Sequence, residues 1–217
     1  VLFHGAGRVK TTGEIFLVSE FMANGDLWDA LAQRDPDTNK PKMRWEERIQ
    51  VAADIAEGMN FLHSRKPPLI HRDLKSQNVL LGRDGRAKIA DFGLSRFAEV
   101  REQAAVARMS FTTEHGDSRI DSMDSLMTLE AQMTGRQGSV LWMAPEIDTK
   151  QDRTKYGLAV DVYSYAIVLV ELITCRKPWE EVKWCYQIQQ MVTSGERPKI
   201  HDHGKVFLSC FHKFFVE

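Results

Sequence analysis

The sequence predicts a mainly α-helical protein with a small β component. Residues 45–63 carry apolar side chains at helical spacing, and residues 160–173 form an apolar run long enough for a buried core helix. Shorter apolar runs at 14–22, 78–81 and 87–90 predict strands. A chain of 217 residues allows one domain with a sizeable core, or at most two small domains.

The N-terminal elements follow from local turn and capping signals. A strand over 14–22 begins after a Thr-Thr-Gly turn and ends at an Ala-Asn-Gly break. Asp26 then offers a side-chain oxygen that can cap a short helix over 27–33. The polar run 35–42 predicts a surface loop.

The longest predicted helix, over 45–63, has one apolar stripe that faces a core. Five residues at helical spacing make up this stripe: Ile49, Ala52, Ala56, Met59 and Leu62. A Pro-Pro pair lies beyond the end of the helix. The runs 78–81 and 87–90 are separated by a Gly-Arg-Asp-Gly turn and therefore predict a hairpin. Residues 100–137 are polar and predict a mobile loop.

The composition argues against several classes of protein. Because 29 Lys and Arg stand against 30 Asp and Glu, the chain has no basic excess with which to bind nucleic acid. Three cysteines without metal-ligand spacing favour a reducing, cytoplasmic setting over a disulfide framework or a zinc site. The best candidate for a membrane span, 157–175, contains Asp161 and Glu171, so we expect a core helix there and no membrane segment.

Three short motifs carry the chemistry, and they follow one another in a fixed order. They are HRDLKSQN at 71–78, DFG at 91–93 and APE at 144–146. With these motifs the chain resembles a eukaryotic protein kinase. The runs KSQN at 75–78 and GSVLWMAPE at 138–146 make it more similar to the serine/threonine kinases of the tyrosine-kinase-like group. The resemblance implies the large, mainly helical C-lobe of a kinase with remnant N-lobe strands.

The resemblance also implies a reaction, which is Mg²⁺-dependent transfer of a phosphoryl group from ATP to serine or threonine in a protein. In this reaction a protein mainly positions the reactants and neutralises charge. Asp73 would accept or orient the proton of the substrate hydroxyl, and Lys75 would steady the phosphoryl group. Asn78 and Asp91 would offer oxygen ligands to Mg²⁺. Each residue alone could be an ordinary polar side chain, and the order of the motifs supports their joint role.

The strand that ends at residue 22 resembles the last N-lobe strand running into the hinge of a kinase. By that match the backbone groups of Glu20 and Met22 would face the edge of adenine, and Ser19 would hold the gatekeeper position. Asp26 would reach a ribose hydroxyl, and Leu80 would form the apolar floor beneath adenine. Ordinary strand packing is the alternative for Ser19 and Leu80.

Further residues match positions that support or regulate the site. Seven fall in this class: His71, Arg72, Phe92, Gly93, Ser139, Glu146 and Asp161. Arg72 precedes the catalytic aspartate, where an arginine can pair with a phosphorylated activation segment. Ser139 would link that segment to Asp73 and Lys75, and Asp161 would hold the backbone around residues 71 and 72. For Asp161, a helix N-terminal carboxylate favoured by the helix dipole is the alternative.

Phosphorylation of the long segment between the DFG and APE motifs is a further expectation. Eight candidate acceptors lie in it: Ser110, Thr112, Thr113, Ser118, Ser122, Ser125, Thr128 and Thr134. Glu146 would lack its arginine partner, because the family's later arginine motif has no counterpart in 201–217. An unpaired glutamate would cost stability if it were buried.

Two departures from the family suggest a partial kinase domain. Neither a complete Gly-rich loop nor a strand lysine precedes residue 14, and Gly5-Ala6-Gly7 matches the turn just ahead of the hinge strand. We therefore divide the chain into remnant strands and hinge (1–22), C-lobe (23–200) and a divergent tail (201–217), and expect these residues alone to be inactive. A pseudokinase-like binding module and a small-molecule kinase are the alternative functions. His201 and His203 are too few ligands to predict a metal site.

Overall fold

The computed structural model describes residues 1–98, 139–147 and 157–200. Four α-helices lie in these ranges: α1 (Leu27–Ala32), α2 (Trp45–His63), α6 (Ala159–Thr174) and α7 (Cys185–Thr193). Six strands are present: β1 (Phe3–Arg8), β2 (Ile15–Ser19), β3 (Leu69–Ile70), β4 (Val79–Leu81), β5 (Ala87–Ile89) and β6 (Arg96–Phe97). Two short 3₁₀ turns are η1 (Ser76–Asn78) and η2 (Val140–Trp142). The prediction of a mainly helical fold with a small β component is confirmed.

The described strands form three antiparallel pairs, β1 with β2, β3 with β6 and β4 with β5. The predicted 78–90 hairpin is confirmed as β4 and β5, with Gly85 in the left-handed region at φ 78° in the turn. The predicted strand 14–22 is confirmed in its centre as β2. The β3–β6 pair was missed because two residues per strand give no alternating pattern.

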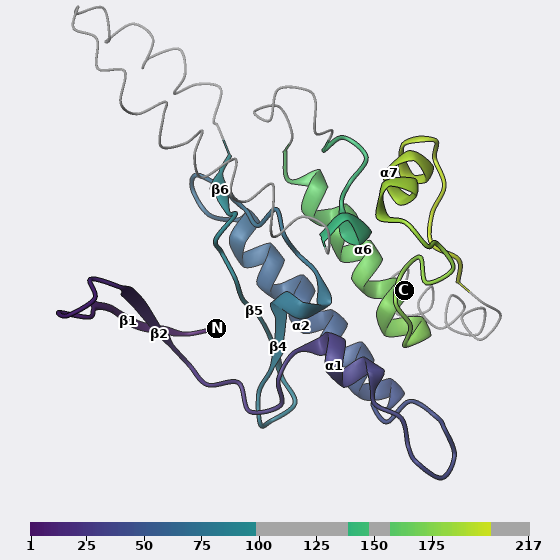
Figure 1. The fold of residues 1–217 in the computed structure, drawn as a ribbon, viewed down its shortest axis with the longest axis horizontal. Helices are drawn as coiled ribbons and strands as arrows, with labels where there is room; N and C mark the ends of the chain where they lie inside the picture. Colours follow the sequence, from purple (N-terminus) through teal and green to yellow (C-terminus); the bar gives the residue numbers. More distant parts are fainter. Residues whose placement is uncertain (99–138, 148–156, 201–217) are drawn as a thin grey trace, which may run out of the picture.

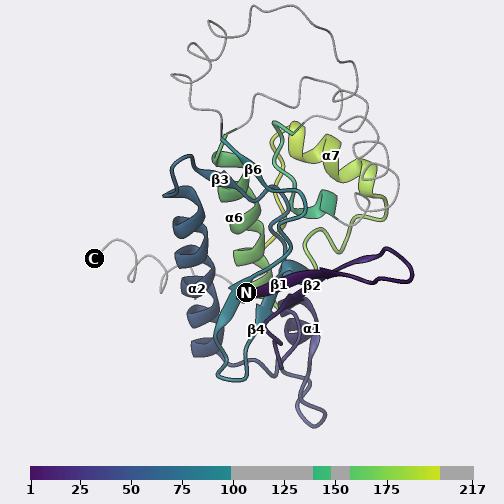
Figure 2. The same cartoon turned by 90° about the vertical axis from the view of Figure 1, so that its left-hand side faces the viewer.

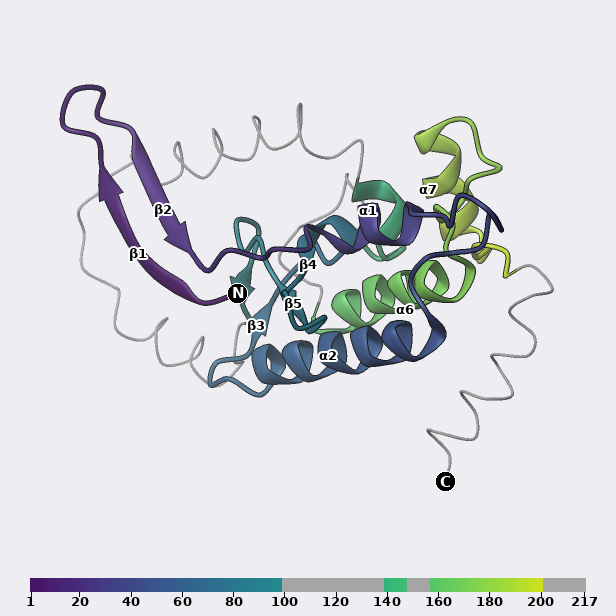
Figure 3. The same cartoon turned by 90° about the horizontal axis from the view of Figure 1, so that it is seen from below.

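The prediction for Gly5-Ala6-Gly7 was wrong, because these residues lie inside β1 and the turn follows at 9–14. Gly7 pairs with Phe16 across the hairpin, and a Cβ on Gly7 would lie 2.3 Å from the Phe16 ring. The aromatic ring therefore occupies the space in which a side chain at position 7 would lie. This hairpin extends away from the helices (Figures 1 and 3).

The helical body is built around α2 and α6, which lie side by side (Figure 3). Helix α2 has the predicted bounds. Ala52, Met59 and Leu62 of its predicted stripe are buried, whereas Ile49 and Ala56 are half-buried. Val51 and Ile55, which were not part of the predicted stripe, are also buried. The buried face is wider than predicted because both α6 and β5 pack against the helix. Figure 2 shows β3 and β6 near one end of α2 and β4 near α1.

Helix α1 begins where the sequence predicts, since the Asp26 side chain accepts a hydrogen bond from the Asp29 amide at 2.9 Å. Helix α6 ends at Cys175, whose backbone is left-handed at φ 48°. Within the described ranges, no helix has both the length and the apolar character that a bilayer crossing requires.

Candidate active site

A carboxylate of α6 binds the backbone of the loop between β3 and η1. Asp161 is buried, and its two oxygens accept hydrogen bonds from the His71 and Arg72 amides, each at 2.8 Å. His63 Nε2 of α2 lies 2.9 Å from the same carboxylate. Arg72 has φ 71°, a conformation that costs energy for a residue with a side chain. The two hydrogen bonds to Asp161 offset that strain, so this contact expected from the sequence is present.

Four polar side chains, from this loop, from η1 and from the later segment at 139, are linked by hydrogen bonds and an ion pair. Lys75 Nζ lies 3.0 Å from Asp73 Oδ2 and donates to Ser139 Oγ at 2.8 Å. Asn78 Nδ2 donates to the Asp73 carbonyl at 2.7 Å and to Asp73 Oδ2 at 3.0 Å. Asp73 is therefore fixed by an ammonium and an amide, and Ser139 joins the later segment to it through Lys75.

His71 connects the loop to the strand that leads into Asp91. Its ring is buried, its Nδ1 accepts from the Asp73 amide at 3.3 Å, and its Nε2 donates to the Ala90 carbonyl at 3.0 Å. This pattern requires the neutral imidazole. Burial lowers the pKa of His71, against the opposing effect of Asp161, Asp73 and Asp91, and so favours the same form.

Asp91 is brought to Asn78 by the backbone. The Ala90 amide donates to the Asn78 carbonyl at 2.8 Å, which places the next residue, Asp91, beside the loop. Asp91 is exposed, has φ 59° and accepts from the Gly93 amide at 3.2 Å. A strained backbone at such a position is common where a side chain is aimed at a ligand.

The donor set of Asn78 and Asp91 fits Mg²⁺. The hydrogen bonds of Asn78 use its amide nitrogen, which leaves Oδ1 out of them, and the Gly93 amide engages only Oδ1 of Asp91. Two protein oxygens suffice for Mg²⁺, which takes most of its ligands from phosphate and water. Within the described residues no group of three or more His, Cys, Asp or Glu side chains could hold a metal, so an ion here would depend on bound phosphates.

Most of the residues predicted to form the adenine site lie between the end of the β1–β2 hairpin and the start of α1, and Leu80 lies in β4. The Glu20 amide donates to the Leu2 carbonyl at 2.8 Å, and Met22 is buried. Asp26 and Leu80 face each other in an isolated β-bridge, so the proposed ribose and floor residues are neighbours. Asp26 uses only Oδ1 to cap α1, and the Ser19 side chain is exposed at the end of β2.

The remaining predicted residues are placed as follows. The Phe92 ring is exposed, and its centroid lies 5.2 Å from that of the His71 ring. Glu146 is exposed, so the cost expected for a buried, unpaired glutamate does not arise. The eight candidate phosphoacceptors, His201 and His203 lie outside the described residues.

Sequence reasoning missed a second buried carboxylate, Glu171, near the other end of α6. Its Oε1 lies 2.7 Å from Ser76 Oγ of η1, and its Oε2 accepts from Trp142 Nε1 of η2 at 2.6 Å. Burial raises the pKa of Glu171 to about 8. The sequence signal was a lone carboxylate in an apolar helix, which we used only to argue against a membrane span.

Comparison with known proteins agrees with this geometry. The protein kinase domain family matches residues 4–206. The chain belongs to the protein kinase family. It is 31% identical to receptor-interacting serine/threonine-protein kinase 2 of Bos taurus, over 88% of this chain and 31% of that protein. It is 34% identical to serine/threonine-protein kinase TNNI3K of Mus musculus, over 85% of this chain and 18% of that protein.

A plant relative shows the same pattern. The chain is 33% identical to calcium/calmodulin-regulated receptor-like kinase 2 of Arabidopsis thaliana, over 82% of this chain and 33% of that protein. The chain thus spans a third or less of the length of these relatives. The predicted relation to serine/threonine kinases of the tyrosine-kinase-like group is confirmed.

Proposed function

We propose that this chain forms the catalytic loop and substrate-binding lobe of a serine/threonine protein kinase that uses ATP and Mg²⁺. The observation that carries the proposal is the joint contact of Asp73 with Lys75 and Asn78, with Ser139 bound to the same lysine. These groups come from segments far apart in the sequence. Such convergence is expected for phosphoryl transfer, which depends on positioning and charge neutralisation.

Each residue has a defined task in this proposal. Asp73 Oδ2 is held by Lys75 and Asn78, so its carboxylate is oriented to accept the proton of a substrate hydroxyl. Lys75 places a positive charge beside the carboxylate, where the transferred group carries negative charge. A Mg²⁺ ion held by Asn78 and Asp91 would neutralise charge on the nucleotide phosphates.

The acceptor is an aliphatic hydroxyl in this proposal. Ser139 Oγ accepts a hydrogen bond from Lys75 Nζ. This bond holds the segment around Ser139 close to Asp73. In the family a lysine at this position accompanies serine and threonine specificity, and the bovine and mouse relatives are serine/threonine-protein kinases. A cytoplasmic location and protein substrates are part of the proposal.

Substitution of Asp73 tests this function directly. In a kinase domain that joins this chain to a Gly-rich loop and a strand lysine, we expect Asp73→Asn to lower phosphorylation of serine peptides by about 10²-fold or more, because the general base is lost. Asp37→Asn is a matched control, since Asp37 is exposed in the loop between α1 and α2. Radiolabelled ATP with serine, threonine and tyrosine peptides gives the readout. Equal rates for Asp73→Asn and wild type, or transfer to tyrosine alone, would contradict the proposal.

A further inference from the structure

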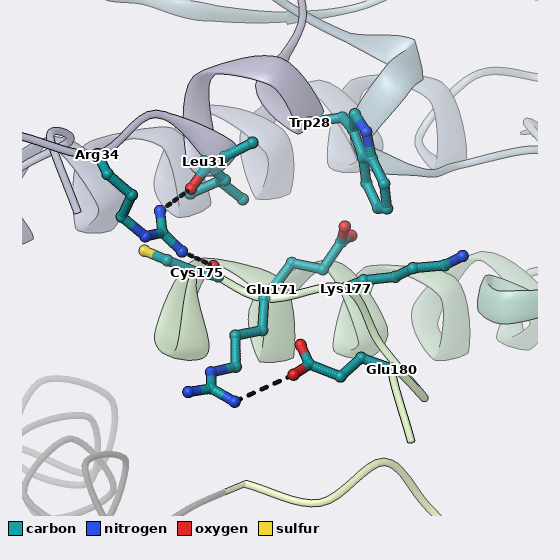
Figure 4. Close-up of a pocket in the computed structure, with 9 residues that line it drawn as sticks. Trp28, Leu31, Arg34, Glu171, Cys175, Lys177 and Glu180 are labelled. Carbon is teal, nitrogen blue, oxygen red and sulfur yellow. Dashed lines mark hydrogen bonds and ion pairs between the residues drawn. The ribbon is translucent and has the colours of Figure 1, made fainter. Parts of the chain in front are cut away.

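A pocket lies beside the catalytic loop, between α1 and the end of α6 (Figure 4). It has a volume of about 300 Å³. Trp28 and Leu31 of α1 form one wall, and Glu171 forms part of the opposite wall. The residues after α6 complete it with charged side chains: Arg176, Lys177 and Glu180.

Positive charge exceeds negative charge around this pocket. Arg34 donates to the carbonyls of Leu31 at 2.6 Å and Cys175 at 2.5 Å, which fixes its guanidinium without neutralising it (Figure 4). Arg176 pairs with Glu180 at 3.1 Å, and both are partly exposed. The Lys177 ammonium has no ion-pair partner among the described residues.

Glu171 does not offset this excess at neutral pH. Among the described residues its two oxygens form hydrogen bonds with Ser76 and Trp142 alone, and its raised pKa of about 8 keeps it mostly protonated at pH 7. Ser76 Oγ and Trp142 Nε1 both donate to this carboxyl group. The pocket is therefore lined by the positively charged Arg34 and Lys177 and by a Glu171 carboxyl group that is mostly neutral.

The pocket is connected to the site of phosphoryl transfer by direct contacts. Ser76, which contacts Glu171, is three residues from Asp73, and Trp142 is three residues from Ser139. The Trp28 ring packs edge-on against Trp142 with ring centroids 6.0 Å apart. Helix α1, which forms one wall of the pocket, contacts η1 of the loop that carries Asp73. An extended peptide advances about 3.3 Å per residue, so a substrate that lies over both elements would span from one to the other in a few residues.

We propose that this pocket binds an acidic side chain of the protein substrate, a few residues from the phosphorylated hydroxyl, and so selects acidic substrates. The inference rests on the proposed function for the identity of the bound protein. Lys177 supplies the free charge, Arg34 supplies a fixed one, and Trp28 covers the aliphatic part of the bound side chain. Complementary charge of this kind contributes chiefly to specificity.

Peptide binding tests the pocket separately from catalysis. Fluorescence anisotropy would compare three short serine peptides whose flanking residues are Asp, Asn or Lys, at near-physiological ionic strength. We expect the Asp peptide to bind about fivefold more tightly than the Asn peptide, an increment in the range of one favourable charge pair. Equal affinity for the Asp and Asn peptides would overturn the inference.

Charge reversal at Lys177 locates the effect. In Lys177→Glu we expect the ratio of Asp-peptide to Lys-peptide affinity to invert, because the free cation becomes an anion. Lys10→Glu makes the same change in charge in the β1–β2 turn, away from the pocket, and should keep the wild-type ratio. An unchanged ratio in Lys177→Glu, or an equal change in Lys10→Glu, would also overturn the inference.

Phosphorylation of the same peptides separates the two proposals. Transfer to serine without any preference for acidic peptides would support the proposed function and contradict the pocket inference. In a kinase domain that includes a Gly-rich loop and a strand lysine, Lys177-dependent binding of the Asp peptide without transfer would contradict the proposed function while supporting an acidic-peptide site.

Discussion

Helix α6 buries one carboxylate near each end, and the two ends serve the catalytic loop differently. Asp161 and Glu171 are each 1% exposed. Asp161 accepts from two backbone amides and contacts His63, whereas Glu171 contacts only a hydroxyl and an indole. The first end fixes the backbone at residues 71 and 72. The second end joins η1 to η2, because Glu171 contacts the side chains of Ser76 and Trp142. Two equally buried carboxylates can therefore have different structural roles.

The largest effect on stability is expected at the Asp161 end. Asp161→Asn keeps the size of the side chain but replaces one acceptor oxygen with a donor, which faces a backbone amide. We expect the free energy of unfolding to fall by about 3 kcal/mol, because a buried amide loses its partner. Urea denaturation measures it. Val162→Asn, at the exposed neighbouring position, is the control and should cost little. A similar decrease in the free energy of unfolding for both variants would contradict the role of Asp161 in holding the loop.

The Glu171 end should instead show a dependence on pH. The unfolded carboxyl ionises near its ordinary value of 4.5, whereas burial keeps the folded one protonated to about pH 8. Stability contributed by this group therefore falls as pH rises between these values, by about 1.4 kcal/mol per pH unit where the states differ by a full proton.

Glu171→Gln removes this dependence while it can still contact Ser76 and Trp142. We expect the variant to be more stable than wild type at pH 9, by about 2 kcal/mol or more, and similar to it near pH 4.5. Denaturation of both proteins across this pH range measures the difference in their free energies of unfolding. Because His71 and the other titratable groups are the same in both proteins, their contributions cancel in this difference. A difference that does not change with pH would show that Glu171 is ionised when folded.

A smaller effect is expected at Ser76, which contacts Glu171. Ser76→Ala should cost about 1 kcal/mol, the usual value for one buried hydrogen bond. The loss should be larger at pH 9 than at pH 6, because the ionised carboxylate depends more on its donors. Ser64→Ala, at an exposed serine after α2, gives the baseline. A loss that is equal at both pH values would argue against coupling to Glu171.

The smallest change in stability is expected at Ser139, where the effect should be on activity. Ser139→Ala removes the hydroxyl that accepts from Lys75, at a half-buried site. We expect a change below about 0.5 kcal/mol in unfolding but about a tenfold lower rate of transfer, since positioning is lost. Ser139→Thr keeps the hydroxyl and should restore much of the rate. Full activity of the alanine variant would contradict the positioning role.

The prediction from sequence succeeded where residues act within a short stretch of chain. The bounds of α2 follow from one apolar stripe, and the start of α1 follows from the Asp26 cap. It failed for Gly7, because Gly7 pairs with a residue on the opposite strand, Phe16, whose ring lies over it. The turns of β4–β5 were local and were predicted, whereas β3 and β6 pair across 25 residues or more.

The motifs at 71–78, 91–93 and 144–146 by themselves determined the family and the residues of the candidate site, because their order in the chain is specific. Only the tertiary structure decided that Glu171 would contact Ser76 and Trp142, and that a positively charged pocket would lie beside them. The physical reason is that a buried carboxyl takes its partners and its pKa from whatever folding packs around it. For Glu171 those partners lie 95 and 29 residues away in the sequence.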